Sequence, residues 1–334
     1  MNSIGISVTS ACNLKCLHCF QNNDRNRREE LPIQKLTEVI NFVKEKGYKS
    51  IIFSGGEFFM HPDAQDILKC ALDKTDAEIT IQNNGTKIDT THFVNSFGKY
   101  NNRLILSFSI DGLQKDHDKR RGKNTFDKII YNNSLLQKSG FRTNAIITID
   151  SHNYLYLADL IDFVADTFTS LALSCIGNIG AACENEQYLG LADEGLKETL
   201  RFVYTNPPSK QTNSNRCNIF PGNLSIKYDG TVYPCGFARD MDVFPMGNIM
   251  INNIQDVIKK FCDSPDGQEI IRFENKKLIQ ECAQCEKISI CTQGCRIRAK
   301  KAFNNLMKPD PFACFIYKNE YNEKSASDIF WGNV

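Results

Sequence analysis

The sequence has little of what a membrane protein, an exported protein or a nucleic-acid-binding protein needs. Its longest apolar runs cover only a few residues, such as 50–53 and 145–149, whereas a membrane-spanning helix needs about 20. Residues 1–11 contain no basic segment followed by an apolar one, so we expect no export signal. The 40 basic side chains are balanced by 39 acidic ones, which argues against nucleic-acid and membrane partners. We therefore expect a soluble, cytoplasmic protein.

Cysteine, by contrast, is abundant, with 14 residues in a chain of 334. The chain is too long for a small secreted scaffold held together by disulfides. In a reducing cytosol, clustered cysteines are typical of metal or cluster ligands. The length indicates about two domains, and the 41% of hydrophobic residues can form a sizeable core.

The first 175 residues alternate short apolar segments with amphipathic ones. Strands are expected at 4–9, 50–53, 78–82, 104–110, 143–149 and 170–175. Helices are expected at 31–46, 62–73, 91–98, 125–139 and 154–168. Such βα repeats imply a parallel sheet with right-handed crossovers. The predicted fold class is therefore α/β, a partial (β/α)6 TIM-like barrel that is two units short of the closed form.

The pattern changes after residue 206, where two prolines begin a polar segment. A hairpin is expected from 224–228 and 231–233, joined by Asp229 and Gly230. A helix at 254–261 and a dense cysteine tract follow. The predicted organisation is a barrel over 1–206, a smaller domain over 207–320 and a loosely attached tail over 321–334.

Cys12, Cys16 and Cys19 form a C-x3-C-x2-C motif directly after the first predicted strand. A cubic iron–sulfur cluster has four irons that each take an outside ligand, so three thiolates leave one iron open. An open iron can chelate the amino and carboxylate groups of S-adenosylmethionine (SAM), and one-electron reduction then releases a 5′-deoxyadenosyl radical. The alternative is a zinc site closed by His18. That residue is cramped between two ligands, and we expect it to lie against a bound ring instead.

Three further motifs follow successive strands. They are Gly55-Gly56-Glu57, Asn84-Gly85-Thr86 and Ser109-Ile110-Asp111-Gly112, the last followed by His117, Asp118, Arg121 and Gly122. Each motif alone is most often only a turn, but their order along the chain is informative. Together with the cysteine motif they resemble the GGE, NGT, SxDG and HDxxRG motifs of the radical SAM superfamily, and the resemblance spans nearly the whole chain.

The resemblance implies SAM as a cofactor and a SAM-binding [4Fe-4S] cluster held by Cys12, Cys16 and Cys19. In the family the GGE motif receives the methionyl amino group, and its glycines allow the backbone to approach closely. The residues expected to contact SAM are His18, Gly55, Gly56, Glu57, Asn84, Ser109 and Arg121. Phe58 stands where the family usually has proline, so we expect a slightly different loop geometry.

Seven cysteines with a defined spacing occupy the second half of the chain. Cys217 is followed by Gly230-x4-Cys235, then by Cys282-x2-Cys285-x5-Cys291-x3-Cys295 and by Cys314. This pattern resembles the SPASM domain, which implies two auxiliary iron–sulfur clusters of the [4Fe-4S] type. By analogy, Cys282, Cys285, Cys291 and Cys314 hold the outer cluster, and Cys217, Cys235 and Cys295 hold the inner one. The fourth inner ligand stays open between water, another side chain, a substrate thiol, Cys183 and Cys262.

The remaining cysteines have no place in these motifs. Cys70 and Cys262 are expected to be small buried hydrophobes. Cys175, at the end of the sixth strand, and Cys183, in the next loop, either pack or donate a hydrogen atom to a substrate radical. Together with Asp111 they are the candidates for a catalytic role.

Relatives with a SPASM domain mostly modify peptides or proteins. We therefore expect a maturase that abstracts hydrogen from a ribosomally made peptide and forms a thioether or carbon–carbon crosslink, or an oxidised residue. The expected partners are this peptide and a flavodoxin or ferredoxin as electron donor. The first strand begins near residue 4, which leaves no room for an N-terminal leader-binding domain. A separate protein therefore recognises the leader, or the barrel binds the peptide directly.

Three alternatives stay open at this point. The first is a sulfatase-maturating, formylglycine-forming enzyme, but that branch has an aspartate directly after the cysteine that corresponds to Cys235, where this chain has Gly236. The second is a small-molecule dehydrogenase or cofactor-pathway enzyme on the same scaffold. The third is a non-catalytic iron–sulfur electron carrier, although such a protein has no use for motifs that bind SAM.

Overall fold

The computed structural model describes residues 2–21, 28–177, 179–185, 194–205, 217–276, 279–291 and 293–318. In these residues the strands form one sheet, in the order β6-β5-β4-β3-β2-β1-β7-β8-β9. The first six strands are parallel, which confirms the α/β class. Their bounds are β1 Ser3–Ser7, β2 Ser50–Ser54, β3 Glu78–Asn83, β4 Leu104–Ser109, β5 Arg142–Ile149 and β6 Ser170–Cys175.

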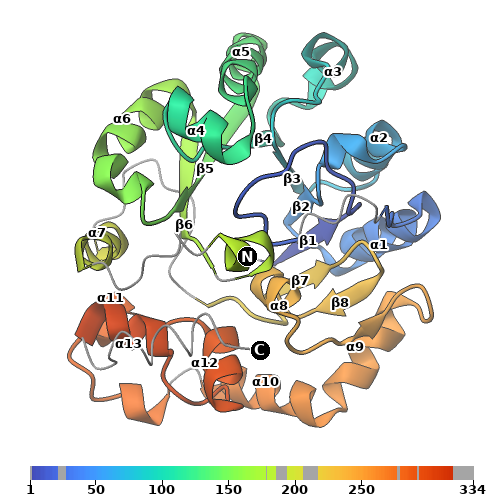
Figure 1. Cartoon of the computed structure of the whole chain (residues 1–334). Helices are drawn as coiled ribbons and strands as arrows, with labels where there is room; N and C mark the ends of the chain where they lie inside the picture. The colour runs from blue at the N-terminus through green and yellow to red at the C-terminus, as the bar shows by residue number, and fades with distance from the viewer. Residues whose placement is uncertain are drawn as a thin grey trace.

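The helices that connect these strands lie along the outer side of the sheet (Figure 1). They are α1 Ile33–Lys46, α2 Ala64–Lys74, α3 Thr90–Phe97, α5 Thr125–Lys138 and α6 Leu157–Thr167, which agree with the predicted helices to within a few residues. An additional helix, α4 Gln114–Arg121, was not predicted because its sequence has no apolar periodicity.

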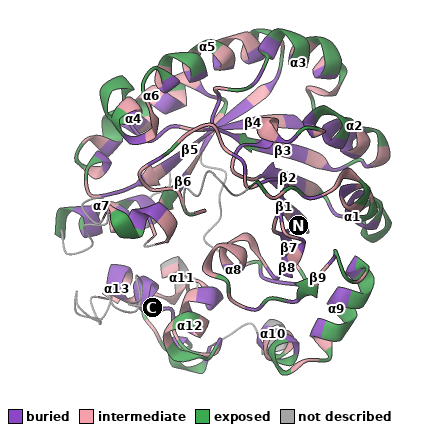
Figure 2. Ribbon diagram, turned by 45° about the vertical axis from the view of Figure 1, so that its right-hand side comes forward, coloured by how far each residue is buried: buried purple, intermediate pink, exposed green. Residues whose placement is uncertain are grey.

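The two faces of the sheet differ in chemistry because successive side chains of a strand point to opposite sides. Ile4 and Ile6 of β1 are fully buried in the same core as the apolar residues of α1. The opposite face carries small polar side chains. There Asn144 donates to the Ser107 hydroxyl at 2.7 Å and accepts from Ser170 at 3.0 Å. The inner face therefore carries polar side chains together with apolar ones such as Ile105 and Ile146, and the main apolar core lies between sheet and helices (Figure 2).

The predicted hairpin is present as β7 Asn223–Ile226 and β8 Thr231–Tyr233, with β9 Gly247–Asn248 beyond it. The sequence did not predict that β7 pairs in parallel with β1, so that the cysteine-rich part continues the sheet of the first part. The predicted domain limits stay predictions, because residue 206 and the segment 321–334 lie outside the described residues.

The remaining helices follow β6 or belong to the cysteine-rich part in the lower half of Figure 1, and the helix that begins at Ile254 reaches α1, where Gln255 Nε2 lies 3.5 Å from Glu45 Oε2. They are α7 Glu194–Thr205, α8 Gly236–Met241, α9 Ile254–Cys262, α10 Pro265–Lys276, α11 Ile288–Cys291, α12 Arg296–Phe303 and α13 Pro311–Lys318. In the described part of the chain, every helix is too short or too polar to cross a membrane.

Candidate active site

The first cysteine loop follows β1 and rests on the turn after β2. The backbone N–H of Gly56 donates to Thr9 O at 2.7 Å, and that of Glu57 donates to Ala11 O at 2.8 Å. Burial raises the pKa of the Cys12 thiol to about 12, and negative charge on Cys16 and Cys19 raises it further. The three thiols thus lie near one another in a site that disfavours free thiolates, and a bound iron cluster would supply the compensating positive charge. Among the described residues, no three Cys, His, Asp or Glu side chains are already arranged as the ligands of a single metal ion.

Gly55 and Gly56 allow the turn after β2 to lie directly against this loop. A Cβ atom on Gly56 would lie 2.4 Å from Ala11 O and 2.5 Å from Ser10 O. Gly55 has a φ of +155° and faces Thr9 O in the same way. These neighbours are backbone atoms that cannot move aside, so both positions require glycine. Phe58, at the usual proline position, is fully buried, and its ring centroid lies 5.5 Å from that of Phe53.

Replacing Gly56 by alanine is expected to displace the cysteine loop and to destabilise the chain by about 1–3 kcal/mol through overpacking. Urea unfolding of the cluster-free protein measures this change. Gly98→Ala is the matched control, because a Cβ there meets nothing within 4 Å. Equal stability of the two variants would show that the glycine turn is not tightly packed.

Glu57 is a buried carboxylate that contacts only hydrogen-bond donors of the backbone. It accepts from the N–H of Asn84 at 2.7 Å and from that of Phe59 at 3.2 Å, and its residue is 1% exposed. Burial raises the pKa of Glu57 to about 7, although both hydrogen bonds oppose this rise. No Lys, Arg or His of the described residues forms an ion pair with it. A buried carboxylate without a cation fits the ammonium group of SAM.

The raised pKa of Glu57 predicts a specific pH dependence. Between pH 4.5 and 7 the folded chain binds more protons at Glu57 than the unfolded chain. The free energy of unfolding therefore falls as the pH rises, by about 3 kcal/mol over this interval. Urea unfolding of the cluster-free chain at several pH values, compared with Glu57→Gln, measures this contribution. Parallel curves for the two proteins would contradict it.

Asn84 holds the cysteine loop in place from the turn after β3. Its amide nitrogen donates to Asn13 Oδ1 at 3.0 Å and lies 3.8 Å from Cys12 Sγ. Its amide oxygen accepts from the hydroxyl of Thr86 at 2.7 Å. The side chain is thus committed to ordering the loop around Cys12, and its predicted contact with SAM stays a prediction.

A buried network of charges lies behind Cys16. Arg121 donates through Nε to Asp111, and its Nη atoms lie 3.9 Å from Cys16 Sγ and 3.1 Å from His18 Nε2. Arg120 donates through Nε to His18 Nδ1 at 2.9 Å and pairs with Asp150. The sequence motifs single out Arg121 but not Arg120. Because Arg121 is already engaged by these partners, its predicted contact with the SAM carboxylate or ribose stays a prediction.

This network fixes the protonation states of Asp111 and His18. Burial alone would raise the pKa of Asp111, but the guanidinium groups of Arg120 and Arg121 hold it far below its usual range. Asp111 is therefore ionised at every physiological pH, which makes it unsuitable as a general base. Burial and the adjacent Arg120 hold the pKa of His18 well below its usual value, so its ring is neutral. Nδ1 of His18 accepts from Arg120, and Nε2 lies 3.1 Å from Arg121 and 3.4 Å from Asp111, so both ring nitrogens already have partners, which disfavours the zinc alternative.

The other catalytic candidates are two cysteines, of which Cys175 is close enough to Asp150 of this network to interact with it electrostatically. Cys175 ends β6, and burial raises the pKa of its thiol to about 12 although the charge of Arg298 opposes this. The thiol therefore stays protonated, as both packing and hydrogen-atom donation require. Cys183 is exposed in the 3-10 helix η4 Gly180–Glu184. Ser109 ends β4 opposite Ile146 of β5.

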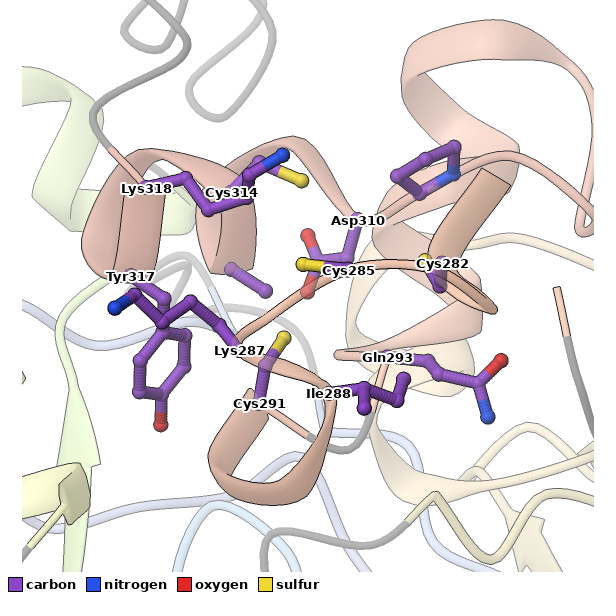
Figure 3. A pocket seen from close by; sticks show the side chains of 12 residues that line it. Cys282, Cys285, Lys287, Ile288, Cys291, Gln293, Asp310, Cys314, Tyr317 and Lys318 are labelled. Atoms are coloured by element: carbon purple, nitrogen blue, oxygen red, sulfur yellow. The ribbon is translucent and has the colours of Figure 1, made fainter. Parts of the chain in front are cut away.

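The four cysteines predicted to bind the outer auxiliary cluster line one pocket. It is bounded by Cys282, Cys285, Cys291 and Cys314, together with Asp310, Tyr317 and other residues, as Figure 3 shows. Burial raises the pKa of Cys291 to about 11, with further contributions from Asp310, Cys282 and Cys285. The structure thus brings these residues together from the 3-10 helix η6 Gln280–Cys282, α11 and α13.

The three cysteines predicted to bind the inner cluster also lie close together. Cys217 precedes β7, Cys235 precedes α8 and Cys295 precedes α12. Burial raises the pKa of Cys217 and of Cys235, and charge on Cys295 raises both further. Burial and, to a smaller extent, the charge of Asp263 raise the pKa of Cys262 on α9, and none of the three inner cysteines contributes to this rise. The fourth ligand of the inner cluster therefore stays open.

Comparison with known proteins gives matches to two family models. The model described as the radical SAM superfamily matches residues 6–164, and the SPASM model, described as an iron–sulfur cluster-binding domain, matches residues 217–286. Together they cover more than half of the chain. The first match includes Cys12, Cys16 and Cys19, and the second includes Cys217, Cys235, Cys282 and Cys285 but ends before the last three cysteines of the pattern.

Similar curated proteins differ in what they act on. The chain is 24% identical to the Fe-coproporphyrin III synthase of Methanosarcina barkeri, over 94% of this chain and 88% of that protein. It is 25% identical to the antilisterial bacteriocin subtilosin biosynthesis protein AlbA of Bacillus subtilis, over 95% of this chain and 71% of that protein. It is 23% identical to a cysteine-type anaerobic sulfatase-maturating enzyme of Clostridium perfringens, over 86% of this chain and 87% of that protein.

Among solved structures, Streptococcus suis SuiB bound to the precursor peptide SuiA superposes with a TM-score of 0.69. The superposition covers 93% of this chain and 75% of the SuiB chain, at 18% sequence identity, and it shows that the two proteins share a fold. The motifs, the sheet and the family matches agree. The chain therefore belongs to the radical SAM superfamily and is an enzyme whose radical SAM domain binds SAM and a [4Fe-4S] cluster and whose SPASM domain binds auxiliary iron–sulfur clusters.

Proposed function

We propose that this enzyme is a maturase that oxidises or crosslinks a ribosomally made peptide. Cys12, Cys16 and Cys19 would hold the SAM-binding cluster, and Glu57 would receive the amino group of SAM. When bound and reduced by one electron, SAM supplies a 5′-deoxyadenosyl radical that removes a hydrogen atom from a substrate carbon. Similarity to the subtilosin biosynthesis protein AlbA supports a peptide as the substrate.

The contacts of Arg239 carry this proposal because they join the SAM site to the inner cysteine group. Arg239 lies on α8, four residues after Cys235. Its Nη1 atom lies 3.5 Å from the hydroxyl of Ser54, the residue before Gly55, and its guanidinium lies 5.9 Å from the ring of Phe20, the residue after Cys19. A substrate radical formed beside SAM would thus lie near an auxiliary cluster. That proximity suits a reaction in which the substrate loses a hydrogen atom, a proton and an electron.

The proposal predicts a product that is lighter than the precursor by about two hydrogens. The short peptides encoded beside the gene are co-expressed with the wild-type enzyme and with Cys16→Ala, and each peptide is then analysed by mass spectrometry. The mass loss is expected with the wild type only. Unmodified peptides from cells whose enzyme holds its clusters and cleaves SAM would contradict the proposal. A leader-binding protein and a flavodoxin or ferredoxin donor remain proposed partners.

Formylglycine formation is the second candidate function, because Asp240 offers a base that the sequence pattern lacks at Gly236. Arg239 Nε donates to Asp240 Oδ1 at 2.8 Å. Burial raises the pKa of Asp240 above its usual value, although Arg239 opposes this rise. A carboxylate with a raised pKa accepts a proton more readily near neutral pH. Similarity to the sulfatase-maturating enzyme also favours this candidate.

A synthetic peptide with one cysteine tests this second candidate, with aldehyde formation detected by a hydrazide probe. Asp240→Asn is expected to lower the yield of aldehyde about a hundredfold if Asp240 is the base. Asp242→Asn is the control, because Asp242 binds the Tyr233 hydroxyl at 2.6 Å and asparagine tolerates its positive φ. Equal yields from the two variants would exclude Asp240 as the base.

A further inference from the structure

Arg296 is a fully buried cation at the start of α12, directly after Cys295. Its Nη1 atom donates to the carbonyl oxygens of Leu306 at 2.8 Å and Lys308 at 2.7 Å, and its Nη2 atom donates to Gln293 O. The Nε atom is buried and has no hydrogen-bond partner within the described ranges. The guanidinium is thus held by neutral carbonyl groups.

No carboxylate of the described residues forms an ion pair with Arg296. Among the carboxylates, Asp310 acts on the pKa of Arg296, which it raises through its negative charge. Asp310, however, pairs with Arg298 at 2.7 Å and accepts from the backbone N–H of Cys295, also at 2.7 Å. The buried cations Arg120 and Arg121, in contrast, each pair with an aspartate. An uncompensated buried charge is costly, so Arg296 needs another anion.

Cysteines of both auxiliary groups interact with Arg296, and their sulfurs become anionic when they ligate a cluster. Its backbone N–H donates to the sulfur of Cys217, which belongs to the inner group. Its guanidinium interacts electrostatically with Cys217 and Cys295 of the inner group and with Cys282 of the outer group. Arg296 therefore lies between the two sets of ligands.

We propose that Arg296 is a counter-charge shared by the two auxiliary clusters and that it raises their reduction potentials. A thiolate-ligated cluster gains one negative charge on reduction, and a nearby buried cation stabilises that state. A higher potential makes each cluster a better acceptor for the electron that the substrate gives up. The inference rests on the assignment of the cysteines to two clusters and on the proposed oxidation, but its test needs no substrate.

Redox titration followed by electron paramagnetic resonance tests this role on the full-length, anaerobically reconstituted protein without SAM. All samples carry Cys16→Ala, which removes the signal of the first cluster. Arg296→Gln is expected to lower the ratio of reduced to oxidised auxiliary cluster about tenfold at a fixed potential. This corresponds to a fall of about 59 mV in the reduction potential for one electron. Arg296→Lys retains the charge and should titrate close to the parent.

Lys300→Gln is the matched control, because it removes a cation from the same helix that is already paired with Glu269 at 2.6 Å. It should leave the potentials unchanged. An unchanged potential in Arg296→Gln, or a shift as large in Lys300→Gln, would overturn the proposal. If Arg296→Gln fails to load iron, Arg296→Lys decides: normal loading and potential support a charge role, and failure shows that Arg296 only shapes the backbone. A parent with no auxiliary cluster signal would instead refute the cysteine assignment.

Discussion

Cys16→Ala is expected to lower the production of 5′-deoxyadenosine to below about 1% of the wild-type level, because two thiolates cannot hold a cubic cluster with one open iron. Cys16 is the buried member of the first cysteine group, and Arg121 lies 3.9 Å from its sulfur. The measurement is chromatography of anaerobic reactions that contain SAM and dithionite. Loss of the product would show that the motif after β1 carries the radical chemistry.

Cys70→Ala is the matched control for this experiment. Cys70 lies on α2, where its thiol is 3.9 Å from the Thr37 hydroxyl, and it belongs to none of the three cysteine groups. Its loss should leave 5′-deoxyadenosine production within about twofold of wild type. Equal activity of Cys16→Ala and Cys70→Ala would contradict the assignment of the first cluster. A wild-type protein that makes no 5′-deoxyadenosine with dithionite would favour the electron-carrier alternative.

The second large effect is expected from Asp111→Asn, which should destabilise the chain by about 3–5 kcal/mol. The substitution removes the anion that pairs with Arg121, and it leaves a buried guanidinium without its partner. Asparagine retains an oxygen for the N–H of Thr148, which donates to Asp111 at 2.8 Å. The loss of stability therefore measures the effect of removing the charge, because the hydrogen bond from Thr148 is retained. Urea unfolding of the cluster-free chain is the measurement.

Asp118→Asn removes one negative charge of α4 that forms no ion pair within the described residues, and it serves as the control. Asp118 accepts from the backbone N–H groups of Asn124 and Phe126 at the start of α5. Weakening this helix cap should lower the free energy of unfolding by about 1 kcal/mol. If Asp111→Asn proves no more destabilising than Asp118→Asn, the buried charges do not act as a network.

Most of the fold around the SAM site could be predicted from local patterns. The predicted strands and helices of the first 175 residues agree with the structure to within a few residues, because apolar periodicity reports which face of each element is buried. Helix α4 escaped prediction because its eight residues are almost all polar. Its place is set instead by charge pairs such as that of Arg121 with Asp111, which no periodicity reveals.

The composition of the cysteine groups was predicted from the resemblance to the SPASM pattern, in which the ligands stand at characteristic spacings. The four cysteines predicted for the outer group line one pocket, and their binding of a cluster stays a prediction. The open position of the inner group could not be predicted, because a fourth ligand can come from any segment that the fold brings near. Spacing along the chain carries no information on such a contact.

Periodicity therefore predicted the parallel strands, and the cysteine loop and the other motifs indicated the family through their resemblance to it. Three features depend on contacts between segments far apart in the chain, so only the folded arrangement reveals them. These are the pairing of β7 with β1, the contact of Arg239 with Ser54, and the lack of an ion-pair partner for Arg296 among the carboxylates that the structure describes. The physical reason is that burial and charge pairing depend on which surfaces meet in three dimensions, whereas a motif records only neighbours along the chain.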